Sequence, residues 1–429
     1  MKGFDAIIVG AGPAGTTAAI KMAQKGLNVL IVERSSFPGE KNMFGGMLPY
    51  CPILELLIPD FINLAPLERF VTKRTLNIMD GNNIFTFTFE SENFNLPPYN
   101  GYTLFRPNFD RWYADIAFKS GAKLITSCLV DELIVHDNKV VGIKAEQDEV
   151  RAPLILLCDG VLSPLSKKIG ISKLPKPSEM GLGLKVLFKL DESILNERFN
   201  IVNKQGATQE FLGCTEGVRG GAFLYTQLET ISVGLVFHLD SLKKSCLPPY
   251  EILQKFLSNP YMRKLLKGAK LIEYSAHLLP ENGYKGIQKL YTNGLLIAGD
   301  AAGFCYTNGL NQEGMNLAIT SGFLAAETAI EALNKGDFSI KTLKAYEERL
   351  KESFILKDMK TFNKMVEIMH NDRLYSVYPK IIGKIFEQIY KSDGKPKKSL
   401  GKTAWDVIKE SISMKNFFYD ILKGGKSVI

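Results

Sequence analysis

The sequence lacks the residue patterns that usually build metal sites. Its 429 residues contain six cysteines and four histidines. All cysteines are more than four residues apart, so no Cys-x-x-Cys motif predicts zinc or an iron–sulfur cluster. We assign no role to the histidines, which are scattered at positions 136, 238, 277 and 370. The sequence therefore predicts no metal, and a reducing cytoplasm is its simplest setting.

Long apolar runs are also missing. No segment approaches the roughly 20 apolar residues that a membrane-spanning helix needs, so we expect any membrane contact to be peripheral, on the cytoplasmic face. Apolar residues make up 45% and charged residues 23%, which is ordinary globular composition. The formal net charge of +8 fits an anionic lipid, an acidic protein or nucleic acid, and a plain basic surface equally well.

A glycine-rich turn near the N-terminus predicts a dinucleotide site. A strand expected over 4–10 leads into a helix over 14–25, and a second strand follows over 28–33. The turn between the first strand and the helix holds Gly10, Gly12, Pro13, Ala14 and Gly15.

Each glycine of the turn has a physical reason. Gly10 permits the tight turn, Gly12 lets the backbone approach a pyrophosphate, and Gly15 lets helix and strand pack closely. The helix N-terminus offers N–H groups to the phosphates. Glu33 ends the second strand, followed by Arg34, and its carboxylate can accept hydrogen bonds from ribose hydroxyls.

A second glycine-rich segment lies almost three hundred residues downstream. Gly299 and Asp300 follow an apolar strand, and this carboxylate can accept hydrogen bonds from the ribityl chain of a flavin. Gly314, Met315 and Asn316 then begin a helix whose N-terminus can stabilise negative charge on a reduced flavin. The pair of segments predicts that the dinucleotide is FAD.

Weaker signals point to the same cofactor. Arg106 stands just before a helix expected over 107–120, and the Asp159-Gly160 turn ends another apolar strand. Val130, in a strand expected over 129–135, completes this set of cofactor contacts. A surface arginine and a plain β-turn are the alternative interpretations.

The fold class that we expect is α/β, with an FAD-binding Rossmann-like domain split by an antiparallel β-sheet substrate domain and followed by a helical C-terminal region. Repeated β segments over 180–240 indicate the inserted sheet. The expected boundaries are 1–71 with 107–178 and 281–336 for the FAD domain, 72–106 with 179–280 for the sheet domain, and 337–429 for the helical region.

Together these segments resemble flavoproteins built like p-hydroxybenzoate hydroxylase. Three stretches look more specifically like FixC-type flavoproteins and the related electron-transfer-flavoprotein:quinone oxidoreductases. They are the loop over 37–46, the start of the helix at 314–318, and the turn at 393–397. The resemblance implies that the loop, with Lys41, Asn42, Met43, Gly45 and Gly46, contacts the cofactor.

The resemblance also implies a function and partners. FAD in those families takes electrons from an electron transfer flavoprotein and passes them towards a quinone or a ferredoxin-like partner. The quinone oxidoreductases end in a cysteine-rich domain that holds a cluster, whereas the last cysteine here is Cys305. We therefore expect the cluster on a small separate ferredoxin-like subunit, and we expect no nucleic-acid partner.

Two other functions stay open. A geranylgeranyl (prenyl lipid) reductase shares the fold, but such proteins usually carry a cysteine in the loop after the second strand; here Cys51 lies only nearby. A flavin monooxygenase is the second alternative.

Three C-terminal segments, at 365–369, 378–386 and 417–422, combine apolar residues with lysine and fit either peripheral membrane contact or ordinary helix packing.

Overall fold

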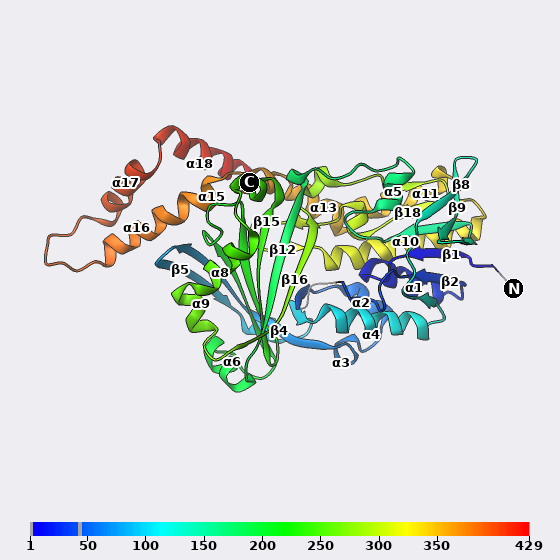
Figure 1. Ribbon diagram of the computed structural model, residues 1–429, viewed down its shortest axis with the longest axis horizontal. Coiled ribbons are helices and arrows are strands. Elements are labelled where there is room, and N and C mark those ends of the chain that lie inside the picture. The colour runs from blue at the N-terminus through cyan, green and yellow to red at the C-terminus, as the bar shows by residue number, and fades with distance from the viewer. Residues whose placement is uncertain (1–2, 42–44, 429) are drawn as a thin grey trace.

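The computed structural model describes residues 3–41 and 45–428, which form two large sheets side by side (Figure 1). The first sheet has six strands. In spatial order they are β17 (Tyr291–Thr292), β18 (Leu295–Ile297), β11 (Leu154–Leu157), β1 (Ala6–Val9), β2 (Val29–Val32) and β7 (Lys123–Ile125). All pairs are parallel except β17 with β18. Every residue of the four central strands is buried, as the apolar runs of the sequence predict for a parallel sheet.

Helices cover this sheet and join its distant segments. Helix α1 (Pro13–Ala23) connects β1 to β2 and packs against α10 (Met315–Lys335) and α4 (Arg106–Lys119). Ten of the eleven residues of α1 are buried, because the helix lies between the sheet and these neighbours. A small antiparallel sheet of β8 (Glu132–His136), β9 (Lys139–Ala145) and β10 (Asp148–Arg151) stands next to β11.

The second sheet has nine strands and is almost entirely antiparallel. Its order is β16 (Lys270–Pro280), β12 (Met180–Lys189), β15 (Thr230–His238), β14 (Gly220–Thr226), β13 (Gln205–Leu212), β4 (Leu67–Asp80), β6 (Gly101–Leu104) and β3 (Gly46–Pro49), with β5 (Asn83–Glu90) paired to β4. Only β13 and β4 pair in parallel among the described strands of this sheet. Helices α6 (Glu192–Phe199), α8 (Pro249–Ser258) and α9 (Pro260–Leu265) contribute to its hydrophobic core.

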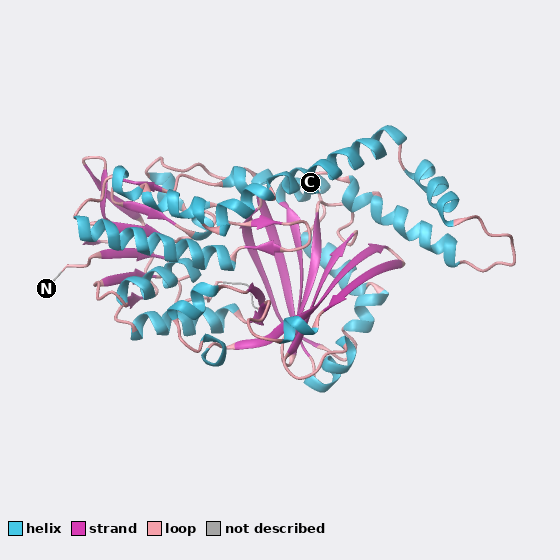
Figure 2. Ribbon diagram, turned by 180° about the vertical axis from the view of Figure 1, so that it is seen from behind, coloured by secondary structure: helices cyan, strands magenta, loops and turns pink. Residues whose placement is uncertain are grey.

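Three C-terminal helices stand at one end of the molecule (Figures 1 and 2). Helices α16 (Tyr378–Tyr390) and α17 (Leu400–Ser411) reach beyond the second sheet, and α18 (Met414–Val428) returns towards the body of the protein. Their own core is small, and α16 packs on β5 through stacked rings of Phe85 and Phe386 whose centroids are 4.4 Å apart. In the described parts of the chain, no helix combines the length and the apolar character that crossing a bilayer requires.

The remaining elements are short. They are α2 (Pro52–Leu57), α3 (Phe61–Leu64), α5 (Pro164–Lys168), α7 (Leu239–Ser245), α11 (Ile340–Leu343), α12 (Ala345–Glu352), α13 (Phe354–Thr361), α14 (Asn363–Met369), α15 (Arg373–Ser376), and the hairpin of β19 (Tyr306–Thr307) and β20 (Gln312–Glu313).

The predicted fold class is confirmed: an α/β part, a large β-sheet part and a helical C-terminal part are all present. The nine-stranded sheet also takes β3, which lies in the chain that the predicted division gives to the FAD domain. The boundaries of the three domains stay a proposal.

Candidate functional site

A cavity of about 800 Å³ lies between the two large sheets. Its wall is formed on one side by the turns that follow β1, β2, β11 and β18, and on the other by strands β12, β14, β15 and β16. The carboxyl ends of the parallel strands therefore face the same space as the second sheet, where a ligand of an α/β fold is expected.

The turn between β1 and α1 has the geometry of a phosphate site. Gly10 has φ +100°, which a residue with a side chain rarely adopts. Among the described residues, no atom stands within 4 Å of the place where a Cβ of Gly12 would lie, so the backbone there borders open space. Pro13 and Ala14 also line the cavity at the start of α1. Gly15 does not: a Cβ there would press on the carbonyl group of Gly10, so Gly15 serves packing.

Glu33 lies at the cavity wall directly after β2. Its carboxylate oxygens accept hydrogen bonds from the backbone N–H of Ala11 and of Ser35, each 2.9 Å long. These bonds fix the carboxylate while each oxygen keeps a lone pair for a hydroxyl group. Arg34 and Lys41 are exposed residues that also line the cavity.

Asp159 is a buried acid in the cavity wall. Burial raises the pKa of its carboxyl group, whereas the nearby Ser163 hydroxyl and the backbone N–H of Leu165 oppose that rise. Neither carboxylate oxygen has a hydrogen bond of good geometry within the described residues, so both can accept one from a ligand. Gly160, with φ +84°, and the buried side chain of Val130 form the wall beside it.

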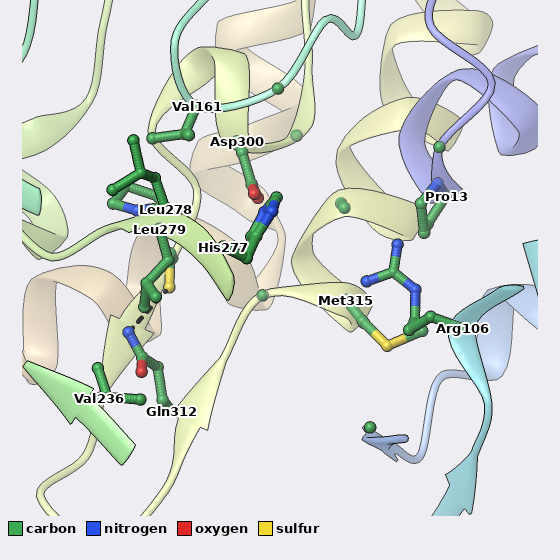
Figure 3. A pocket seen from close by; sticks show the side chains of 18 of the residues that line it. Pro13, Arg106, Val161, Val236, His277, Leu278, Leu279, Asp300, Gln312 and Met315 are labelled. Atoms are coloured by element: carbon green, nitrogen blue, oxygen red, sulfur yellow. Dashed lines mark hydrogen bonds between the residues drawn. The ribbon is translucent and has the colours of Figure 1, made fainter. Parts of the chain in front are cut away.

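Asp300 enters the cavity from a short turn after β18 (Figure 3). Burial raises the pKa of its carboxyl group to about 6, and the positive charge of Arg106 opposes that rise. Arg106 is itself held by Asp110, with Nε–Oδ1 and Nη2–Oδ2 distances of 3.1 and 2.9 Å. The preceding Gly299 has φ +68° and also lines the cavity.

The start of α10 contributes two of the three predicted residues. Gly314 and Met315 line the cavity, and Met315 lies beside Arg106 in Figure 3. Asn316 is buried outside the wall, where its Nδ2 donates to Glu313 at 2.7 Å and its Oδ1 lacks a partner. Asn316 is therefore near the start of the helix, as predicted, but it does not line the cavity.

The loop that resembles FixC-type chains is described only in part. Gly45 and Gly46 line the cavity. A Cβ on Gly46 would lie 3.7 Å from Cγ of Arg106 and 3.9 Å from Sδ of Met315. Asn42 and Met43 lie outside the described residues.

The sequence analysis missed the polar residues that the second sheet turns towards the cavity. Lys185 on β12 donates to the carbonyl of Gly45, and its Nζ stands 5.1 Å from the ring centroid of Phe223 and 5.7 Å from that of Tyr225. Burial, helped by Arg106, lowers the pKa of Lys185 to about 7. A lysine within the apolar run of 181–188 was the available signal.

Histidines and acids also line this side, although the sequence analysis gave the histidines no role. His277 and Glu210 line the cavity from β16 and β13. Burial lowers the pKa of His277 to about 4, with Arg106, Arg34 and Lys185 adding to the effect. Burial raises the pKa of Glu210 to about 7. His238 and Glu281 lie nearby in the same wall.

The described residues fit a dinucleotide with a flavin. The glycine turn leaves room for a pyrophosphate, Glu33 offers oxygens to a ribose, and Asp159 and Asp300 are buried acceptors. Fold and site together define an FAD-dependent oxidoreductase. The family model "FAD dependent oxidoreductase" matches residues 5–158, in agreement with that class and with FAD as the cofactor.

The family is narrower than that class. Residues 180–279 match the model "ETF-QO, ubiquinone-binding", and residues 365–429 match the "ETF-QO/FixC family C-terminal domain". The chain is 38% identical to the probable electron transfer flavoprotein-quinone oxidoreductase YdiS of Escherichia coli K12, covering 99% of each chain. It is 40% identical to the protein FixC of the same strain, covering 91% of each. The chain belongs to the FixC/ETF-QO family of FAD-dependent oxidoreductases.

A solved structure supports the fold. A geranylgeranyl bacteriochlorophyll reductase-like protein from Thermoplasma acidophilum superposes with a TM-score of 0.72. The match covers 96% of this chain and 98% of that protein, at 21% sequence identity. At this identity the likeness concerns the fold alone.

Proposed function

We propose that this FixC/ETF-QO-like oxidoreductase passes electrons from an electron transfer flavoprotein through FAD to a quinone. One observation carries the proposal: the cavity is continuous from the glycine turns to strands β12–β16. Those strands lie in the segment that matches the ubiquinone-binding model. A cofactor and a second redox molecule can therefore meet in one cavity.

We assign the cofactor contacts by chemistry. Gly10, Gly12, Pro13 and Ala14 present the N-terminus of α1 to the pyrophosphate, and Glu33 accepts from the adenosine ribose. Asp159, with Gly160, and Asp300, with Gly299, are the acceptors that remain for hydroxyl groups of the cofactor. The remaining wall residues from the predicted set are Arg34, Lys41, Gly45, Gly46, Arg106, Val130, Gly314 and Met315.

FAD, when bound, supplies reversible uptake of two electrons. The protein's own residues set the surroundings. Arg106 and Lys185 bring cationic groups to the cavity, where they would favour an anionic reduced cofactor. Phe223 and Tyr225 on β14 cover the sheet side and reduce access of water.

A separate iron–sulfur subunit fits this function. Residues 306–429 contain no cysteine, so this segment supplies no thiolates for a cluster. We propose that a small ferredoxin-like subunit carries the cluster and that the excess of positive charge assists docking of acidic partners.

We also propose peripheral membrane contact at the C-terminal end. Phe87 and Phe89 on β5 are each 59% exposed, and Tyr390 at the end of α16 is 78% exposed. Four lysines follow within 391–398. Aromatic side chains beside lysines suit an anionic lipid surface. Co-sedimentation with anionic vesicles should fall in a variant with Phe87→Ser and Phe89→Ser.

No feature of the described site specifically favours the prenyl-reductase alternative. Cys51 is buried, bonds weakly to Thr320 at 3.9 Å, and is not among the described residues that line the cavity. Burial raises the pKa of its thiol to about 11, which keeps it protonated and unreactive.

Reconstitution tests the function. The FAD-loaded protein is mixed with its host's electron transfer flavoprotein, reduced in advance, and a short-chain ubiquinone. Quinone-dependent oxidation of the partner flavin supports the proposal. Failure of that reaction, with saturation of a geranylgeranyl chain by the dithionite-reduced protein, would establish the reductase alternative instead.

A further inference from the structure

Three side chains form a row from the cavity wall towards the surface. Glu281, just after β16, lines the cavity, and its side chain is 10% exposed. His238 ends β15 with its side chain 5% exposed, and its Nε2 lies 3.3 Å from Oε2 of Glu281. The ring of His370, after α14, stands edge-on to the ring of His238 with the centroids 5.1 Å apart. His370 is only half-buried.

The row contains two nitrogen atoms that make no hydrogen bond within the described residues. They are Nδ1 of His238 and Nε2 of His370, and both are buried. Nδ1 is the nitrogen of His238 that does not face Glu281. Unsatisfied buried polar atoms are costly, and two in neighbouring rings call for a functional explanation.

The ionisation of the row suits proton transfer. Burial raises the pKa of Glu281 to about 7, whereas a hydrogen bond from Gln312 opposes the rise. Burial lowers the pKa of His238 to about 4, so this imidazole is neutral at pH 7 and has one nitrogen to accept and one to donate. Glu281 is then half protonated at neutral pH, which suits a group that gives and regains a proton.

We propose that Glu281, His238 and His370 conduct a proton from solvent to a quinone that is reduced in the cavity. The inference rests on the proposed function. Reduction of a quinone to a quinol takes two electrons and two protons. Bound FAD, in its anionic reduced form, would supply both electrons and one proton, and Glu281 would supply the second proton. The carboxyl O–H bond breaks as the quinol O–H bond forms.

Glu281 regains its proton through the histidines. Nε2 of His238 gives a proton to the Glu281 carboxylate, and Nδ1 of His238 accepts a proton from His370. His370 then takes up a proton from solvent. Oxidised FAD and a quinol would then remain, with His238 left as its Nδ1–H tautomer. Return of His238 to the Nε2–H tautomer completes the cycle, so one proton passes per turnover.

Neighbouring elements place polar and charged side chains around the row. Gln312 from β20 donates to Oε1 of Glu281 at 3.1 Å, and the Cys305 thiol and Tyr375 of α15 stand near the same carboxyl. Arg219 from the turn before β14 pairs with Asp240 and reaches Asp372 at 3.4 Å. Arg219 and His370 lower the pKa of His238, whereas Asp240 raises it. Asp372, 77% exposed, marks the solvent end.

The first test follows the carboxyl group itself. In infrared pH titrations of the FAD-loaded protein without an acceptor, we expect a protonated-carboxyl band that titrates near pH 7. Glu210 also has a pKa of about 7 and contributes to this band. The band should therefore lose part of its intensity in Glu281→Gln and keep all of it in Glu273→Gln, which removes a carboxylate from β16 outside the cavity wall. A band unchanged in Glu281→Gln overturns the assignment.

The second test is kinetic. The protein is reduced with dithionite and mixed in a stopped-flow instrument with a short-chain ubiquinone or with ferricenium, which accepts an electron and no proton. Glu281→Gln should slow the quinone reaction about 100-fold and leave the ferricenium reaction within twofold. Slowing of both reactions alike would show structural damage instead of lost proton transfer, and would overturn the relay.

A variant of His370, the residue of the row nearest to solvent, and the wild-type protein together distinguish failure of the relay from failure of the proposed function. His370→Gln should slow the quinone reaction, and added imidazole should restore it. Wild-type protein that is not reoxidised by quinone refutes both the relay and the proposed function. Rapid wild-type reoxidation with equal rates and pH profiles in Glu281→Gln refutes the relay alone.

Discussion

Gly322 of α10 lies directly against the carbonyl group of Ala14 of α1. A Cβ on Gly322 would overlap that carbonyl oxygen and stand 2.8 Å from its carbon. The two helices belong to the two glycine-rich segments, so this contact joins cofactor-binding elements that are some three hundred residues apart in the chain. The absence of a side chain at Gly322 sets the distance between them.

Gly322→Ala should therefore destabilise the protein. The added methyl group meets backbone on a packed helix, and we expect a loss of about 3 kcal/mol in the free energy of unfolding. Gly401→Ala is the matched control, because Gly401 is also helical and no atom lies within 4 Å of its Cβ position. The control should gain up to about 1 kcal/mol from helix propensity. Urea denaturation measures both, and equal effects would contradict the packing argument.

Gly12→Glu should prevent FAD binding without unfolding the protein. The position borders open space, so the glutamate side chain has room in the absence of FAD. With FAD, its charge and bulk would oppose the pyrophosphate, and we expect at least a 100-fold loss of affinity, about 2.7 kcal/mol. Gly3→Glu, where the Cβ position is equally open but lies outside the cavity wall, is the control. Flavin absorbance after gel filtration gives the result, and retained flavin would refute the phosphate-site assignment.

The local patterns of the sequence predicted residues that the fold brings to one cavity. Strand, glycine turn and helix are consecutive in the chain, so the positions of Gly12 and Glu33 follow from short-range geometry. Seventeen of the predicted residues line the cavity, whereas Gly15 and Asn316 do not and Asn42 and Met43 are not described.

The residues that the second sheet contributes to the cavity could not be predicted, because their positions depend on how distant strands pair. Lys185 and Glu281 meet the cavity only because β12 lies between β15 and β16 in the second sheet. No single segment reveals that arrangement. The histidines had no predicted role, yet His238 and Glu281 stand 3.3 Å apart after folding. A 43-residue separation gives no periodic signal.

Lys185→Met should stabilise the protein at neutral pH. Burial lowers the folded-state pKa to about 7 from an ordinary value of 10.5. Protonation therefore favours the unfolded state, and the folded state loses stability as the pH falls from 10.5 towards 7. At pH 7 the substitution should add up to about 4 kcal/mol, and the gain should shrink towards zero near pH 10. Lys189→Met on the same strand, 63% exposed, should change little. Urea denaturation of the FAD-free protein at several pH values tests this, and a gain that does not depend on pH would contradict it.

Asp420 should make attachment of α18 sensitive to acid. Its carboxylate accepts two bonds of 2.6 Å from Arg373 and one of 2.7 Å from Tyr378, so α18 is tied to α15 and α16. The hydrogen bonds from Arg373 lower the pKa of Asp420 from 3.8 to about 2. Because the folded-state pKa is the lower one, the stabilisation is complete above about pH 4 and is lost as the pH falls through 2.

Asp420→Asn should cost about 2 kcal/mol in this attachment at pH 6 and almost nothing at pH 2. Limited proteolysis at pH 6 should then cut the variant faster within 391–398, between α16 and α17. Asp406→Asn is the control, because its bond to Lys398 is a surface pair worth about 0–1 kcal/mol. Cleavage of Asp420→Asn at the wild-type rate would show that apolar packing alone holds α18. The Asp420 carboxylate would then have no role in positioning the C-terminal helices.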